Sequence, residues 1–290
     1  MQTIPLEVIH QLKIANTSWL GGRQNGHWRV YRGDTELVLR RWAQPENEVF
    51  YEISLLERMA ALGWPIATVL EEPLLWDGVY WSLSQLLPGA PLPNTDLEEQ
   101  RQRGRLLAEL HADTATLADI SQRQGWRPGE ETLADPTLDT LFMANEKRLP
   151  YEVRLLRWHL DLARQRLSEI GILTRPTLIV HGDFTLWNLL FQNGKLSGVL
   201  DFELAHRDHR IAEFALAWRG KYDAVIHGYH EVAPLEPIEW ALITPLWWAS
   251  LIEQAATLLR AQTWDDGWIA AKFLQRSPLM AEFGTYVDRG

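Results

Sequence analysis

The stretch IVHGDFTLWNLLFQNGKLSGVLDFE, residues 179–203, carries most of the information about this chain's fold. The apolar run at residues 177–180 predicts a buried strand with a loop leaving its end. Two further apolar runs, 189–191 and 196–200, flank the dipeptide Asn193-Gly194. Asn-Gly is the strongest short hairpin signal, because both central residues of the turn take a positive φ. The stretch therefore predicts a strand, a loop and a hairpin, in that order.

This predicted hairpin positions three oxygen-bearing side chains. Asn188 stands at its start and Asp201 at its end, so we expect them to lie close together, with Asp183 in the preceding loop. Magnesium is usually held by one or two protein oxygens, while phosphates and water complete the octahedron. A carboxylate outside the metal shell can orient an attacking hydroxyl and accept its proton. The pattern therefore favours phosphoryl transfer from a magnesium nucleotide.

The chain has 290 residues, 46% of them hydrophobic, which fits one large domain or two packed lobes. It contains no cysteine. Disulfides and thiolate metal sites are thus excluded, and we expect a cytoplasmic location. Residues 1–10 lack the features of a signal peptide. The longest apolar stretch, residues 240–252, contains Pro245 and is too short to span a bilayer, so we expect no membrane partner.

The net charge of −10 argues against nucleic acid as a partner, because neutralising phosphates needs a basic surface. The acidity is typical of a solvated surface and is also compatible with a cationic substrate.

The first third of the chain reads as strands and one helix. Residues 26–31 and 36–41 flank a turn and predict a hairpin. Residues 46–62 predict a helix, because apolar residues recur at three- and four-residue steps. Two more strand-like runs follow, at 68–70 and 79–83.

The pattern becomes helical beyond Pro88-Gly89, which marks a predicted boundary between lobes at 1–88 and 89–290. Residues 95–98 resemble a capping box that opens a helix. Residues 151–170 predict another helix, closed by Gly171. Several helices rich in Trp and Leu follow from about residue 212. The expected fold class is α+β, with a strand-rich small lobe and a helix-rich large lobe.

Two motifs resemble the aminoglycoside phosphotransferase and choline kinase family, which has the protein-kinase-like fold. The catalytic loop HGDxxxxN stands here as residues 181–188, and the metal segment, apolar residues followed by DFE, stands as 199–203. The resemblance implies a small N-terminal lobe with an antiparallel sheet and a large, mainly helical C-terminal lobe. It also implies that Asp183 is the catalytic base and that Asn188 and Asp201 bind Mg²⁺.

The likeness departs from the family pattern just after the metal segment. Relatives usually continue with Asp-Pro and then Asp-Leu-Ala, where this chain has Asp208-His209 and Glu213-Phe214-Ala215. The resemblance implies that Glu213 replaces an aspartate that braces the catalytic loop. We expect His181 to brace the same loop through hydrogen bonds.

The small lobe matches the family more loosely. Residues 20–26 resemble the phosphate-covering loop, in which Gly21 and Gly22 let backbone N–H groups approach phosphates. Arg40 stands where many relatives carry Lys, and it can grip phosphate with two N–H groups. Its expected acidic partner is Glu52, with Glu48 one helical turn earlier as the alternative.

The segment from Gln85 to Leu87 resembles the linker between lobes, whose backbone binds the adenine edge in related enzymes. The implied donor is ATP or GTP. We therefore expect an ATP- or GTP-dependent kinase that phosphorylates a hydroxyl of a small molecule such as an amino alcohol, an aminoglycoside or a sugar.

Aromatic and acidic residues near the C-terminus either hold a cationic acceptor or pack a helical core. They are Trp240, Trp247, Trp248, Trp264, Trp268, Glu239, Glu253, Asp265 and Asp266.

Two other classes of protein stay open at this point. A catalytically silent nucleotide-binding pseudokinase is compatible with Arg40 and with the altered segment at Glu213. A metal-dependent hydrolase built on His181 and Asp183 would need a second His cluster, for which only His206 and His209 are near. The sequence determines neither the acceptor, the preferred nucleotide nor the oligomeric state.

Overall fold

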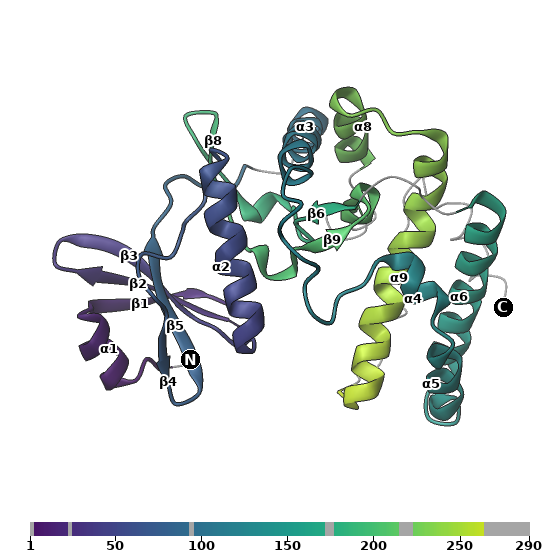
Figure 1. Ribbon diagram of the computed structural model, residues 1–290, viewed down its shortest axis with the longest axis horizontal. Helices are drawn as coiled ribbons and strands as arrows, with labels where there is room; N and C mark the ends of the chain where they lie inside the picture. Colours follow the sequence, from purple (N-terminus) through teal and green to yellow (C-terminus); the bar gives the residue numbers. More distant parts are fainter. Residues whose placement is uncertain (1–2, 23–24, 93–95, 172–176, 215–222, 264–290) are drawn as a thin grey trace. The chain divides into compact units, whose positions relative to one another are not determined.

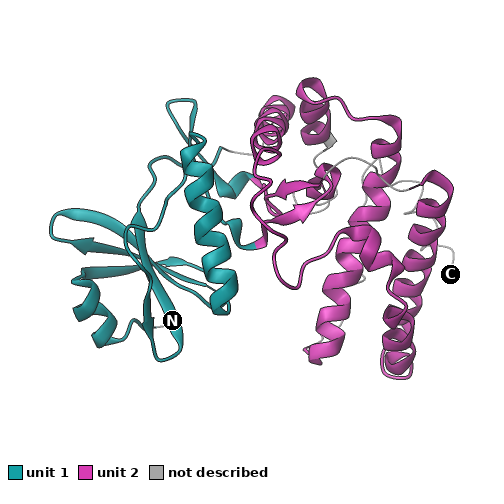
Figure 2. Ribbon diagram, viewed as in Figure 1, with its two compact units in different colours: residues 1–92, 186–203 teal, residues 93–185, 204–290 magenta. Residues whose placement is uncertain are grey.

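The computed structural model describes residues 3–22, 25–92, 96–171, 177–214 and 223–263. The chain forms two compact units, shown in different colours in Figure 2. Unit 1 contains residues 1–92 and 186–203, and unit 2 contains the remainder. The predicted lobes, 1–88 and 89–290, are each continuous in sequence, whereas unit 1 also contains the segment 186–203.

Unit 1 is built on a five-stranded antiparallel sheet with the order β1-β2-β3-β5-β4 (Figure 1). Its strands are β1 (Ala15–Gly21), β2 (Gly26–Arg32), β3 (Thr35–Arg41), β4 (Leu74–Trp76) and β5 (Val79–Gln85). The predicted strands at 26–31, 36–41 and 79–83 are confirmed. The predicted strand at 68–70 is wrong, because only Val69 makes an isolated bridge, to Ser84.

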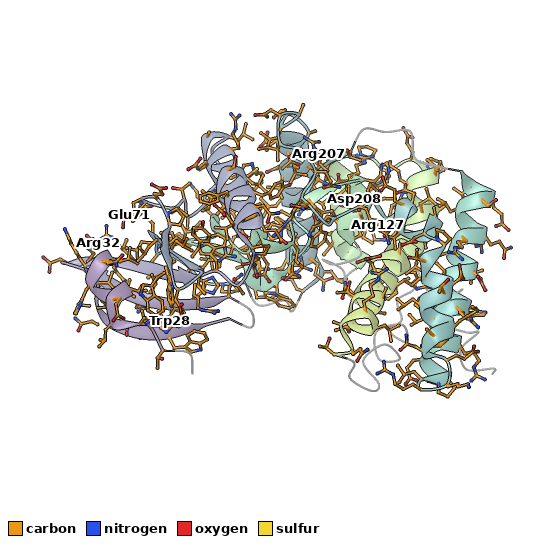
Figure 3. The ribbon with its side chains drawn as sticks, turned by 60° about the horizontal axis from the view of Figure 1, so that its bottom comes forward. Trp28, Arg32, Glu71, Arg127, Arg207 and Asp208 are labelled. Atoms are coloured by element: carbon orange, nitrogen blue, oxygen red, sulfur yellow. The ribbon has the colours of Figure 1, made fainter. Side chains whose placement is uncertain are left out.

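Two helices complete the core of unit 1. The helix α1 (Leu6–Leu12) packs Val8 and Leu12 into a cluster with Trp28 and Val30 of β2; Trp28 is labelled in Figure 3. The helix α2 (Glu46–Ala61) confirms the predicted helix. Sequence patterns missed α1, β1 and β4. In β1 six of seven residues are exposed, so the strand shows no apolar alternation.

The predicted hairpin forms within unit 1 from β7 (Leu189–Gln192) and β8 (Lys195–Val199). Its turn residues Asn193 and Gly194 have φ values of 53° and 74°, which is the backbone geometry that an Asn-Gly turn requires. Phe191 exchanges backbone hydrogen bonds with Ala90, at 2.9 and 3.1 Å. The hairpin is therefore anchored to unit 1 by strand-like pairing.

Unit 2 is mainly helical, which agrees with the expected fold class. Its helices are α3 (Leu97–Thr114), α4 (Gly129–Ala134), α5 (Thr137–Asn145), α6 (Pro150–Ile170), α8 (Asp223–Val232) and α9 (Pro237–Ala261). The predicted helix 151–170 corresponds to α6, and Gly171 follows it with a φ of 99°. The cap of α3 is Asp96, whose carboxylate accepts the N–H of Glu99 at 2.8 Å. Thr95 lies outside the described residues.

Close packing of α3 against α8 depends on two glycines. A Cβ at Gly104 would lie 1.9 Å from the carbonyl oxygen of Val225. A Cβ at Gly228 would lie 2.1 Å from the carbonyl oxygen of Arg101. Because these are backbone atoms, no side-chain adjustment relieves such contacts, and the two helices approach closely only with glycine at both positions.

A short antiparallel pair, β6 (Leu178–Val180) and β9 (His206–Asp208), precedes and follows the HGD motif in unit 2. Arg207 of β9, labelled in Figure 3, donates to the carbonyl oxygens of Ile120 at 2.6 Å and Thr177 at 3.3 Å. The amide of Gln122 bonds both the N–H and the carbonyl of Arg207. These side-chain bonds tie β9 to residues 120 and 122 and to the residue before β6.

The Trp-rich helix α9 contributes to the core of unit 2. Trp247 and Trp248 are 2% and 1% exposed. The Trp248 ring lies 4.4 Å from that of His159 on α6. Trp264 and Trp268 lie outside the described residues. Among the residues that the structure describes, no helix has both the length and the apolar character needed to cross a membrane.

Candidate active site

The HGD segment follows β6, and its glycine is required by geometry. Gly182 has a φ of +83°, a conformation that side chains disfavour. A Cβ there would lie 2.5 Å from the carbonyl oxygen of Leu204. Glycine at this position therefore lets the loop pass close to the chain that follows the metal segment.

The carboxylate of Glu213 holds the backbone of this loop. Glu213 is fully buried, and its Oε2 accepts the N–H of His181 at 2.5 Å. Its Oε1 accepts the N–H of Gly182 at 3.0 Å and that of Phe184 at 3.4 Å. Three of the four N–H donors of residues 181–184 are thus satisfied by one side chain, and the loop takes its shape from that carboxylate.

His111 on α3 completes the environment of Glu213. Its Nε2 lies 3.5 Å from Oε2 of Glu213, and its Nδ1 lies 3.0 Å from the hydroxyl of Tyr229. Burial opposes ionisation of Glu213. The hydrogen bond and charge of His111, the charge of His181 and the Gly182 N–H outweigh burial and lower the pKa of Glu213 below its ordinary value. The buried carboxylate is therefore ionised at neutral pH.

The backbone of Asp183 is held on both sides. Its N–H donates to Nδ1 of His181 at 3.2 Å, and its carbonyl accepts the N–H of Thr185 at 2.7 Å. His181 is itself 1% exposed, whereas Asp183 is half-buried. The loop thus presents the Asp183 carboxylate from a backbone that local hydrogen bonds constrain.

A second buried carboxylate anchors the start of α9. Glu239 is 1% exposed and receives two hydrogen bonds from Arg210, at 2.6 and 2.7 Å. Glu239 also accepts the backbone N–H of Glu236 as part of a capping box. Of the acidic residues considered for a cationic acceptor, Glu239 is thus committed to a structural ion pair.

The candidate metal residues Asn188 and Asp201 belong to unit 1. They stand at the open end of the β7–β8 hairpin, where the N–H of Leu200 donates to the carbonyl of Asn188 at 2.8 Å. Asp201 has a φ of +66°, a strained value for a residue other than glycine. An amide oxygen and a carboxylate on adjacent strand ends are donors that fit Mg²⁺, with phosphates and water as its other ligands.

Arg40 on β3 pairs with Glu52 on α2. Their two hydrogen bonds are 2.6 and 3.2 Å long, and Glu52 is 1% exposed. The Arg40 guanidinium lies 3.7 Å from the ring of Trp42, whose indole N–H donates to Ser82 at 2.9 Å. Arg40 is therefore oriented from two sides. The structure pairs Arg40 with Glu52, the favoured of the two predicted acids.

The strand register places His27 opposite Arg40. Burial, together with the charge of Arg40, lowers the pKa of His27 to about 4, although a bond to the Gly21 backbone opposes the shift. His27 is consequently neutral at pH 7 and adds no positive charge beside Arg40.

The remaining predicted nucleotide contacts also lie in unit 1. Gly21 ends β1, and Gly22 follows it with a φ of +126°. Gln85 ends β5 opposite Leu37, and Leu87 follows in the linker. Unit 1 thus contains every residue predicted to bind nucleotide or metal, whereas Asp183, His181 and Glu213 belong to unit 2.

Sequence reasoning assigned no role to two polar residues in unit 1. The Nδ2 of Asn25 donates to Oε2 of Glu203 at 2.6 Å, across 178 positions of sequence. Nothing local in the sequence pairs these residues. Both residues lie inside motifs that the family resemblance identified, and those motifs were the only indication in the sequence that either residue has a function.

The hydrolase alternative would need a cluster of metal ligands. Within the described part of the chain, no group of three or more His, Asp or Glu side chains could hold a metal ion. His206 lies 3.6 Å from Asp208, whereas His209 lies 3.1 Å from Glu130 on α4. The two histidines therefore contact different carboxylates.

Comparison with known proteins places the chain. Residues 20–243 match the phosphotransferase enzyme family. The homoserine kinase of Xanthobacter autotrophicus is 27% identical over 78% of this chain and 74% of its own length. The homoserine kinase of Azorhizobium caulinodans is 28% identical over 75% and 71% of the two chains.

Solved structures agree on the fold. A thermostable mutant of aminoglycoside phosphotransferase APH(4)-Ia, in complex with AMP-PNP and hygromycin B, matches with a TM-score of 0.66 and 18% identity, over 92% of this chain and 95% of that one. Spectinomycin phosphotransferase APH(9)-Ia, in complex with ADP and spectinomycin, matches with a TM-score of 0.64 and 13% identity over the full length of both chains.

The fold and the family match define a kinase-like phosphotransferase. This chain belongs to the phosphotransferase enzyme family, and the predicted family, fold class and reaction class are confirmed. It is a small-molecule kinase that acts on a hydroxyl group, which disfavours the pseudokinase alternative.

Proposed function

We propose that this chain phosphorylates the primary hydroxyl of a small amino alcohol or hydroxy amino acid of the homoserine type, using a magnesium nucleotide. The single observation that carries the phosphotransfer assignment is the HGD loop held by the buried Glu213 carboxylate. A loop whose backbone is fixed in this way presents Asp183 in one orientation, as a catalytic base requires.

The choice of acceptor class follows the curated relatives. Four homoserine kinases match this chain at 25–28% identity. The first three cover about three quarters of both sequences, as their alignments of 243 to 256 residues show. The antibiotic kinases are below 20% identical and support the fold rather than the acceptor.

In the proposed reaction Asp183 accepts the proton of the acceptor hydroxyl as the hydroxyl oxygen attacks the γ-phosphorus, and the bond from that phosphorus to the β–γ bridging oxygen breaks to release the nucleoside diphosphate. Glu213 and His181 hold the loop that carries Asp183. Asn188 and Asp201 are the residues that would hold Mg²⁺, which neutralises charge on the phosphates when it is bound. Arg40, oriented by Glu52 and Trp42, would grip the donor phosphates with its remaining N–H groups.

An acceptor panel tests the assignment. Purified protein would be mixed with Mg-ATP or Mg-GTP and homoserine, choline, ethanolamine, hygromycin B, spectinomycin or a hexose, and nucleoside diphosphate release would be measured. We expect homoserine or another small amino alcohol to give the highest kcat/KM. Higher kcat/KM with hygromycin B or spectinomycin would overturn the acceptor class while keeping the kinase.

Replacing the proposed base tests the mechanism. We expect Asp183→Ala to lower kcat by on the order of 10²–10⁴, because the hydroxyl loses its proton acceptor. The KM for nucleotide should change little, since Asp183 is not a proposed nucleotide contact. Asp34→Asn, at the exposed β2–β3 turn, is the control. Unchanged turnover in Asp183→Ala would reject the role of Asp183.

The predictions of a cytoplasmic location and of no nucleic-acid or membrane partner remain predictions from composition.

A further inference from the structure

Asn25 closes the glycine-rich loop of unit 1 and uses both ends of its side-chain amide. The residue is only 3% exposed. Its Nδ2 donates to Glu203 at 2.6 Å, and its Oδ1 accepts the N–H of Ala43 at 2.8 Å. Asn25 therefore connects the end of the loop both to the β3–α2 connection and to the metal segment.

The shape of the loop depends on where Asn25 lies. A Cβ at Gly22 would lie 1.8 Å from the carbonyl oxygen of Asn25, so these two residues lie close together. With a φ of +126°, Gly22 occupies a conformation that side chains rarely adopt. A shift of Asn25 would consequently displace Gly22, whose backbone N–H is proposed to face the phosphates.

Glu203 lies two residues after Asp201, in the short 3₁₀ turn Phe202–Leu204. Phe202 between them is 2% exposed and anchors the segment in the core. The same oxygen that accepts from Asn25 lies 3.5 Å from the amide nitrogen of Gln44. A bond from an amide to a carboxylate is stronger than one between neutral groups. The Asn25–Glu203 bond can therefore move Asn25 when Glu203 moves.

We propose that Asn25 and Glu203 are positioning residues that couple metal binding at Asp201 to the placement of Gly22 on the nucleotide phosphates. A metal that orders Asp201 also orders the carboxylate that holds Asn25, because both acids lie on one three-residue segment. The inference rests on the proposed function, which assigns the metal to Asp201 and the phosphates to the loop.

A donor–acceptor exchange tests the coupling. The variants are Asn25→Asp, Glu203→Gln and the double variant with both changes. Asn25→Asp sets two carboxylates against each other, and Glu203→Gln removes the charge. In the double variant the amide introduced at position 203 donates to the carboxylate introduced at position 25, whose other oxygen still accepts the Ala43 N–H. Glu57→Gln, on the exposed side of α2, is the matched control.

Two measurements are made on the full chain. Calorimetry gives the affinity for ATP with and without Mg²⁺, and hydrogen exchange follows residues 20–28 without nucleotide. We expect each single variant to lose roughly tenfold of the affinity gain that Mg²⁺ provides and to exchange faster in this segment. The double variant should recover most of both properties, and Glu57→Gln should match the wild type.

The inference is overturned if the single variants keep the full increase in ATP affinity that Mg²⁺ provides. It is also overturned if the double variant regains no more of this increase than either single variant has. Failure of the proposed function looks different, because the wild-type protein would then show no Mg²⁺-dependent affinity for ATP and no phosphorylated acceptor. A wild type that phosphorylates its acceptor beside single variants with an intact Mg²⁺ gain refutes the coupling alone.

Discussion

The two units each bury one glutamate beside a proposed functional residue, but they stabilise its charge in different ways. Glu52 in unit 1 is 1% exposed and faces the guanidinium of Arg40. Glu213 in unit 2 is completely buried and faces three backbone N–H groups and one imidazole. Leaving a carboxylate unpaired in either place would cost several kcal/mol.

The difference teaches what each carboxylate controls. A glutamate bonded to a single side chain orients only that side chain, and Arg40 has the aromatic face of Trp42 as a second support. A glutamate bonded to three backbone N–H groups of one loop determines the path of the chain. Loss of Glu213 should therefore disturb the catalytic loop itself, whereas loss of Glu52 should disturb one contact to the donor.

The largest effect is expected for Glu213→Gln. The amide removes the charge and places an NH₂ group against backbone donors, so we expect the free energy of unfolding to fall by about 3–5 kcal/mol. We also expect kcat to fall on the order of 100-fold, because Asp183 loses its defined orientation. Chemical denaturation and steady-state kinetics measure both. A Glu213→Gln variant with wild-type kcat would show that the bonds from Glu213 to the loop contribute to stability alone.

A smaller effect is expected for Glu52→Gln. Arg40 keeps its stacking on Trp42 but loses a charged partner, which costs about 2 kcal/mol of stability. The KM for nucleotide should rise roughly tenfold, as for the loss of one charge-assisted contact, while kcat changes less. Glu48→Gln, one turn earlier on α2, is the matched control. Should Glu48→Gln raise this KM more than Glu52→Gln, the assigned partner of Arg40 is wrong.

Acid should weaken the bonds from the Glu213 carboxylate to the backbone of the HGD loop. Because the folded-state pKa of Glu213 is lowered below its ordinary value of 4.5, its stabilisation is fully present above pH 4.5 and is lost as pH falls through the lower folded value. The difference in unfolding free energy between the wild type and Glu213→Gln should therefore narrow below pH 4.5.

Buried histidines provide the background for that titration. Burial lowers the pKa of His159 to about 4, and burial and Arg40 do the same for His27. Their stabilising effect is present above their ordinary pKa of 6.5 and is lost as pH falls towards 4. The wild type and Glu213→Gln lose this stabilisation equally, so it cancels in the difference between their unfolding free energies. A difference in unfolding free energy that stays constant from pH 6 to 3 would contradict the lowered pKa of Glu213.

The smallest effect is expected at a surface ion pair. Arg32 and Glu71, labelled in Figure 3, pair with side-chain exposures of 33% and 44%. Glu71→Gln should lower the free energy of unfolding by less than about 1 kcal/mol, because solvent screens the pair. The kinetic constants should not change. A loss comparable to that of Glu52→Gln would mean that burial does not distinguish these carboxylates.

Local sequence patterns predicted the elements that carry the proposed site. Asn193-Gly194 takes the positive φ values that its hairpin needs, and the apolar periodicity of residues 46–62 matches α2. Both signals are local, since a turn dipeptide or a helix face depends on residues within a few positions of each other. The exposed strand β1 and the three-residue strand β4 carried no such pattern and were missed.

The sequence by itself determined the class of enzyme, because Asp183, Asn188 and Asp201 lie within one short segment and their spacing can be recognised without the fold. The family resemblance also predicted Glu213 and Glu52 as supports for the HGD loop and for Arg40, whereas only the tertiary structure decided that Asn25 bonds Glu203. The bonds from Glu213 to the loop, from Arg40 to Glu52 and from Asn25 to Glu203 span 12 to 178 positions. Buried polar groups must find partners, but folding in three dimensions selects which distant partner comes within reach.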